Sequence, residues 1–157
     1  MGRDEWTPRQ ATAHDADEVA HLLHDFNTEF DTESPGADVL AARLRGLLAG
    51  GETIAILAGT PAVAVALVTL RPNVWYAGQV ALLDELYVVP RRRGQGIGSA
   101  IVDLLVSMAR GRGVELIEIN VDEGDVDAQR FYERHGFSST EPGSSERAFY
   151  YTQELTT

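Results

Sequence analysis

The hydrophobic pattern changes from strand-like to helical between Leu82 and Met108. From Leu82 to Val89 the residues are mostly apolar, as in a buried strand, and Pro90 ends the run. From Ile97 to Met108, apolar residues recur at helical spacing. The pattern therefore predicts a strand, a short turn and an amphipathic helix.

The same kind of pattern predicts the other elements. Apolar stripes predict helices over residues 19–30, 37–48 and 128–135. Apolar and β-branched runs predict strands over residues 9–12, 52–58, 62–71, 114–121, 137–139 and 147–155. The strands at 82–89 and 114–121, joined by the central helix, form a crossover unit with parallel strands. We expect an α/β fold with one mixed sheet and helices on both faces.

The turn before the central helix is rich in arginine and glycine. Arg91–Arg93 are followed by Gly94, Gly96 and Gly98. Open N–H groups at a helix start, together with the helix dipole, favour an anion such as a phosphate. A Walker loop is excluded because the chain has no Lys, and a Rossmann fingerprint would need glycine where Ser99 stands. An ordinary glycine-rich turn stays as the alternative.

Two sequence blocks resemble the GNAT superfamily of acetyl-CoA-dependent N-acetyltransferases. The first is R-x-x-G-x-G over residues 93–98, and the second is A-x-x-x-Y-E-x-x-G-F over residues 128–137. The resemblance implies the GNAT fold, with a mostly antiparallel mixed sheet and a central parallel strand pair. It also implies transfer of an acetyl group from acetyl-CoA, as co-substrate, to a primary amine.

The resemblance further implies where acetyl-CoA binds. In this family the glycine loop holds the pyrophosphate, and the pantetheine arm pairs with a free strand edge. The coenzyme contacts that it implies are Leu86, Tyr87, Val88, Arg93, Gly94, Gln95, Gly96, Ile97, Gly98, Ser99, Asp125 and Ala128. Asp125 departs from the family pattern, which often has Asn at that position.

Acetyl transfer needs an acid for the departing thiolate and a base for the amine, whose pKa is about 10.4 if it is lysine-like. The resemblance implies that Tyr132 is the acid, with simple packing on the helix as the alternative. Asp84 and Glu85 interrupt an apolar strand, and alternation places them on opposite faces unless a bulge intervenes. Polyamine-type family members imply Asp84 as the base and Glu85 near the substrate. Proton removal by water alone, or solvated carboxylates without a role, remain open.

The first predicted helix is expected to form part of the acceptor site. Phe26 and Glu29 lie where the family builds its acceptor pocket, so we predict that they contact a small cationic amine. The net charge of −11 weakly favours such a substrate by steering, although solubility alone would also explain it. His21, His24 and Asp25 lack a further ligand motif, so no metal is expected.

Composition predicts a single domain over residues 1–157. The acidic balance argues against nucleic acid, and no apolar run approaches the roughly 20 residues of a membrane helix. Without Cys or an apolar leader, a cytoplasmic protein is expected, and a homodimer is left open. Two alternative functions are an acyl-CoA sensor without turnover and an acetyltransferase of protein N-termini or side chains.

Overall fold

A computed structural model describes residues 6–155 of the chain. The chain divides into two compact units, Met1–Ile119 and Asn120–Thr157. The single domain over residues 1–157 therefore stays a prediction. Among the helices within residues 6–155, none combines the length and apolar character needed to cross a membrane.

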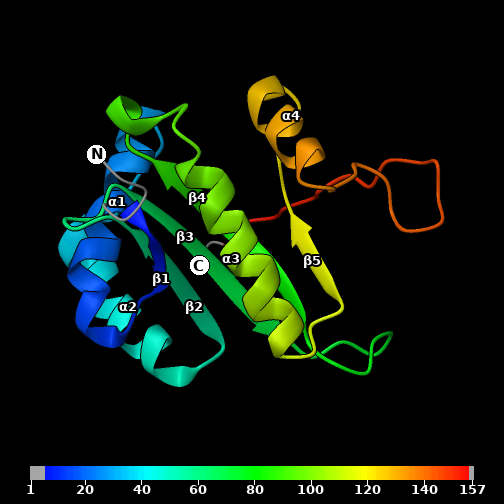
Figure 1. Cartoon of the computed structure of the whole chain (residues 1–157), viewed down its shortest axis with the longest axis horizontal. Coiled ribbons are helices and arrows are strands. Elements are labelled where there is room, and N and C mark those ends of the chain that lie inside the picture. The colour runs from blue at the N-terminus through cyan, green and yellow to red at the C-terminus, as the bar shows by residue number, and fades with distance from the viewer. Residues whose placement is uncertain (1–5, 156–157) are drawn as a thin grey trace. The chain divides into compact units, whose positions relative to one another are not determined.

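The first unit is built on a mixed sheet. Its strands are β1 (Pro8–Gln10), β2 (Thr53–Ala58), β3 (Ala64–Arg71), β4 (Val80–Val88) and β5 (Leu116–Ile119). They lie in the order β1-β2-β3-β4-β5, and neighbours are antiparallel except for the parallel pair of β4 and β5 (Figure 1). The predicted fold class is confirmed. Within the described residues, the parallel pair lies at one edge of the sheet rather than at its centre.

Helices cover both faces of this sheet. α1 (Ala16–Glu29) and α2 (Ala37–Gly50) pack against each other, and α3 (Ile97–Gly111) connects β4 to β5. Figure 1 shows α3 lying across one face of the sheet, while α1 contacts β3 and β4. The consecutive residues 55–58 of β2 are completely buried. Since neighbouring side chains of a strand point to opposite faces, both faces must be covered.

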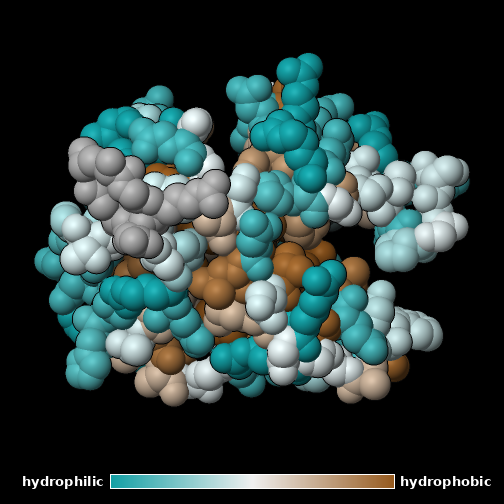
Figure 2. All heavy atoms as spheres, viewed as in Figure 1, coloured by the Kyte–Doolittle hydropathy of each residue, from teal (hydrophilic) through white to brown (hydrophobic). Residues whose placement is uncertain are grey.

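The exposure of α1 follows the predicted amphipathic stripe. Val19 and Ala20 are fully buried, whereas Asp17 and His21 are exposed. Figure 2 shows hydrophilic side chains over the outer side of this helix. Burial of its apolar stripe therefore fixes which side of α1 faces the sheet.

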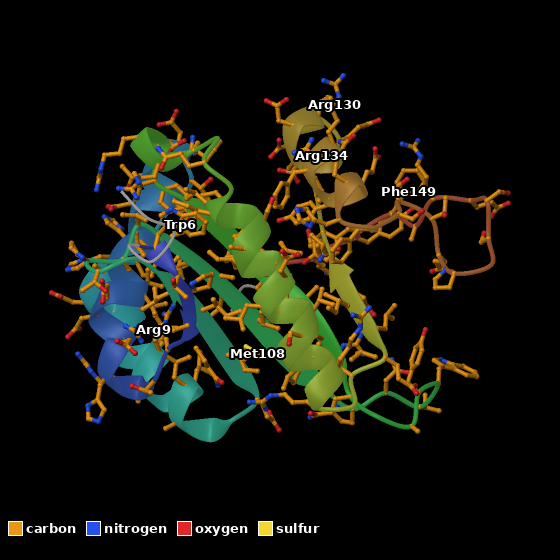
Figure 3. The ribbon with its side chains drawn as sticks, viewed as in Figure 1. Trp6, Arg9, Met108, Arg130, Arg134 and Phe149 are labelled. Atoms are coloured by element: carbon orange, nitrogen blue, oxygen red, sulfur yellow. The ribbon has the colours of Figure 1, made fainter. Side chains whose placement is uncertain are left out.

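The chain enters α1 through a side-chain cap. Thr12 and Asp15 form a capping box around η2 (Ala13–Asp15), in which Asp15 accepts from the Thr12 N–H at 2.8 Å. Arg9 of β1 (labelled in Figure 3) donates to both oxygens of the same carboxylate, at 2.9 and 3.0 Å. These hydrogen bonds lower the pKa of Asp15 to about 2, and the bond from Arg9 has the larger effect.

The second unit contains the helix α4 (Val126–Arg134). The prediction of strands over residues 137–139 and 147–155 was wrong, because no strand is found after α4 in the described part of the chain. A strand needs a continuous ladder of partners. Within residues 6–155, this region has a single isolated bridge, between Thr140, just after the first segment, and Arg147, at the start of the second. Phe149 (labelled in Figure 3) is 70% exposed. The β-branched and aromatic composition therefore did not specify a paired strand there.

Candidate active site

β4 runs beyond its parallel neighbour. Pairing with β5 covers only residues 80–83 of β4, so among residues 6–119 no strand pairs with the rest of that edge. The Val89 N–H donates to the Val63 carbonyl on the β3 side, at 2.9 Å. Backbone groups of a strand alternate between its two edges. The N–H groups of Val88 and Leu86 therefore point to the edge away from β3, where the sequence predicted coenzyme contacts.

A bulge in β4 places two carboxylates on one face of the sheet. The register with β3 shifts between Leu67 and Val68, and Asp84 is the extra residue. Glu85 lies opposite Leu67, while Asp84 Oδ2 accepts a hydrogen bond from Thr69 Oγ1 at 2.6 Å. Leu67 and Thr69, two residues apart, share a face. The bulge thus removes the alternation that would have separated Asp84 from Glu85.

The two carboxylates have different surroundings. Asp84 is exposed, whereas Glu85 is partly buried. Burial, and secondly the nearby charge of Asp84, raise the pKa of Glu85 above its usual value. Such a pair holds a proton more readily than an isolated surface carboxylate. The pair has the chemistry of a proton acceptor.

Tyr87 joins β4 to the predicted acceptor helix. Its ring stacks on Phe26 with centroids 5.0 Å apart, and its hydroxyl donates to Glu29 Oε1 at 3.1 Å. Burial, followed by the hydrogen bond to Glu29, raises the pKa of Tyr87. Phe26 and Glu29 are therefore brought to the face of the sheet that also carries Asp84 and Glu85.

The glycine loop has an open helix start. Gly94 and Gly96 have φ angles of +74° and +85°, and the N-cap Gly96 has no side-chain cap hydrogen bond. A Cβ atom at either glycine would meet nothing within 4 Å. Buried Ile97 anchors the helix below the loop. The structure brings together the predicted loop contacts Arg93, Gly94, Gln95, Gly96, Ile97, Gly98 and Ser99.

In the second unit, the predicted residues cluster around α4. Asp125 is the N-cap, and its Oδ1 accepts from the Ala128 N–H at 3.1 Å. The ring of Tyr132 makes edge contacts with Phe131 and Phe137, at centroid distances of 5.1 and 5.8 Å. The contacts of Asp125 and Ala128 with coenzyme, and the role of Tyr132 as acid, stay predictions.

Two features of the site were missed by sequence reasoning. One is Thr69, which bonds Asp84 from the neighbouring strand. The other is the ion pair of Arg93 with Glu29, which joins residues 64 positions apart. No local pattern signals either contact, because both depend on strand register and on how α1 packs.

The fold and the glycine loop correspond to a known family. The sequence pattern of the "Acetyltransferase (GNAT) family" matches residues 16–137, which include both β4 with its loop and α4. The chain belongs to this family. It is an N-acetyltransferase and therefore an acyltransferase enzyme.

Individual relatives agree with this assignment. An aminoalkylphosphonate N-acetyltransferase of Salmonella typhimurium is 29% identical over 140 residues, covering 84% of each chain. An aminoglycoside N(6')-acetyltransferase of Klebsiella aerogenes is 42% identical over 62 residues, 38% of this chain and 41% of its own. A solved structure from Arthrobacter sp. FB24 is 54% identical, with a TM-score of 0.88, and covers 94% of this chain and 95% of its own.

Proposed function

We propose that this enzyme transfers the acetyl group of acetyl-CoA to the primary amine of a small molecule. The observation that carries the proposal is the unpaired edge of β4, which is followed, after the 3-10 turn η3 (Pro90–Arg92) and the glycine loop, by the open N-terminus of α3. Enzymes of this family generally use acetyl-CoA. The edge offers N–H groups to an extended arm, and the helix start offers N–H groups to phosphate.

The glycine loop fits a phosphorylated coenzyme. The Cβ atoms missing from Gly94 and Gly96 leave open space in front of exposed backbone. The remaining contacts that we propose are the backbone of Leu86, Tyr87 and Val88. When bound, acetyl-CoA supplies an activated acetyl thioester. The N–H group of Leu86 or Val88 would donate to the oxygen that gains negative charge in the reaction.

Proton transfer completes the reaction. The amine nitrogen forms a bond to the acetyl carbon, and the carbon–sulfur bond breaks. The carboxylate pair of Asp84 and Glu85 accepts the amine proton, directly or through water, and the Tyr132 phenol protonates the departing thiolate. We keep Asp84 as the predicted base. The raised pKa of Glu85 makes that residue the second candidate.

The roles of these residues are tested by release of free thiol. Tyr132→Phe keeps the ring contacts and removes the hydroxyl, so kcat should fall by roughly 10²-fold while the Kd for acetyl-CoA stays unchanged. Comparing Asp84→Asn with Glu85→Gln should show which carboxylate is the base. Only the variant that lacks the base should recover activity as the pH rises and more of the amine is unprotonated. A wild-type protein that binds acetyl-CoA but releases no thiol with any amine would instead be a sensor.

The acceptor is proposed to be a cationic small amine. Two relatives are an aminoalkylphosphonate N-acetyltransferase and an aminoglycoside N(6')-acetyltransferase, whose substrates are small molecules that carry an amine. The two kinds of substrate differ in charge, however. The net charge of −11 and the carboxylates of the acceptor face favour the cationic kind. A matched pair of substrates, propane-1,3-diamine and 3-aminopropylphosphonate, tests this choice. The diamine should react faster, and its advantage should shrink as salt is raised.

A further inference from the structure

The guanidinium of Arg93 connects the coenzyme loop to the end of α1. Its Nε donates to the Val88 carbonyl at 2.9 Å, on the unpaired edge of β4. Its Nη1 and Nη2 each lie 2.9 Å from an oxygen of Glu29, the last residue of α1. This paired geometry uses the planar fork of arginine, which a lysine cannot reproduce. Arg93 immediately precedes Gly94, so these bonds tie the start of the glycine loop to the end of β4 and to the end of α1.

Glu29 is held by two partners from β4 and the loop. Besides the bonds from Arg93, its Oε1 accepts from the Tyr87 hydroxyl at 3.1 Å. Arg93 also lies over the Tyr87 ring, 5.6 Å from its centroid. The hydrogen bond from Arg93 is the main reason that the pKa of Glu29 is lowered. An acceptor amine would therefore have to compete with an arginine for this carboxylate.

We propose that Glu29 is a positioning residue for the coenzyme loop and acts on it through Arg93. This assignment rests on the proposed function, because it requires the loop to bind acetyl-CoA. It changes two expectations from the sequence. Glu29 orients the loop instead of binding the acceptor, and Arg93 holds the backbone of the loop in place instead of contacting the pyrophosphate. The start of α3 and the end of α1 are consequently linked.

Calorimetric titration of acetyl-CoA into the full chain tests the assignment. Glu29→Gln keeps the size of the side chain but removes its charge, so the Kd should rise roughly tenfold, as for the loss of a charged hydrogen bond. Arg93→Lys should weaken binding by a similar factor, because lysine keeps the charge but not the fork. Asp17→Asn is the matched control. It removes an exposed ion pair between α1 and Arg45 of α2, and it should leave the Kd unchanged.

A double variant tests whether the two residues act as a unit. Glu29→Gln combined with Arg93→Gln should weaken binding no more than the worse of the two single variants. The KM for the acceptor should change little in Glu29→Gln, provided that thermal unfolding shows an intact fold. A general loss of stability would not raise the Kd for acetyl-CoA while leaving the KM for the acceptor nearly unchanged.

Three results would overturn the assignment. The first is an unchanged Kd in Glu29→Gln. The second is full binding by Arg93→Lys together with loss in Arg93→Gln, as expected for a direct phosphate contact. The third is a rise confined to the acceptor KM, which would return Glu29 to the acceptor site. A wild-type protein that does not bind acetyl-CoA at all would overturn the proposed function itself, so the two failures are distinguishable.

Discussion

The N-termini of α3 and α4 are capped in opposite ways. α4 begins at Asp125, whose carboxylate accepts the Ala128 N–H at 3.1 Å. α3 begins at Gly96, which has left-handed backbone dihedrals and no side-chain cap hydrogen bond. The first turn of any helix leaves N–H groups without intrahelical partners. In α4 a carboxylate of the chain satisfies one of them, whereas at the N-cap of α3 a Cβ on Gly96 would meet nothing within 4 Å.

The difference bears on which of the two sequence blocks is the better candidate for binding an anion. A carboxylate at a helix start satisfies a donor and also places a negative charge where a phosphate would bind. A glycine N-cap adds neither charge nor side chain. This contrast supports our proposal that the phosphate binds at α3. The predicted coenzyme contact at Asp125 would have to use atoms other than the oxygen bonded to Ala128.

The largest expected effect comes from closing the open helix start. Gly96→Val would place a branched side chain in the space in front of the loop, at a φ of +85°. Left-handed dihedrals alone cost a residue with a Cβ roughly 1–2 kcal/mol. This strain lowers the stability of the folded chain. The branched side chain would in addition exclude the phosphate, so the Kd for acetyl-CoA should rise at least about tenfold. Calorimetry measures the change.

A second glycine provides the control for backbone strain. Gly51, at the end of α2, has a φ of +83°, and a Cβ there also meets nothing within 4 Å. Gly51→Val should therefore lower stability about as much as Gly96→Val without changing the Kd. Equal affinity of the Gly96 variant and the wild-type protein would remove the α3 start from the coenzyme site.

A smaller effect is expected at the charged cap that leads into α1. The pKa of Asp15 is lowered to about 2, chiefly by its hydrogen bond with Arg9. A lowered folded-state pKa stabilises the protein above the unfolded-state pKa, and this stability is lost as the pH falls. Asp15→Asn should cost about 1–2 kcal/mol at pH 7, allowing for the exposure of Arg9.

Urea unfolding as a function of pH checks this prediction. The difference between Asp15→Asn and the wild-type protein should be complete above about pH 4 and should shrink toward pH 2, where the wild-type carboxylate takes up its proton. A difference that is constant with pH would mean that the shape of the cap, and not its charge, stabilises this segment.

The smallest effect is expected from removing the cap of α4. Asp125→Ala should cost about 0.5–1 kcal/mol, in the lower range for N-cap residues because the site is exposed. Asp125→Asn should retain the cap and serves as the control. Amide hydrogen exchange at Ala128 should be faster in the alanine variant alone. A large rise in the Kd for acetyl-CoA in both variants would show instead that the Asp125 charge contributes to coenzyme binding.

Local signals in the sequence predicted much of this structure. Helical periodicity predicted α1, α2 and α3. Glycine spacing predicted the open start of α3. These features depend on residues within one or two turns of each other. The strand predicted over residues 147–155 failed because a strand also needs a partner, and composition alone does not provide one.

The sequence by itself determined the class of enzyme, the glycine loop before α3 and the presence of Asp84 and Glu85 on one strand. Only the tertiary structure decided that a bulge places both carboxylates on the same face, because the bulge exists only in the register between β3 and β4. Tertiary structure also decided that Arg93 binds Glu29. That contact joins chain segments 64 residues apart, and it forms because the packing of α1 on the sheet brings the end of the helix beside the loop.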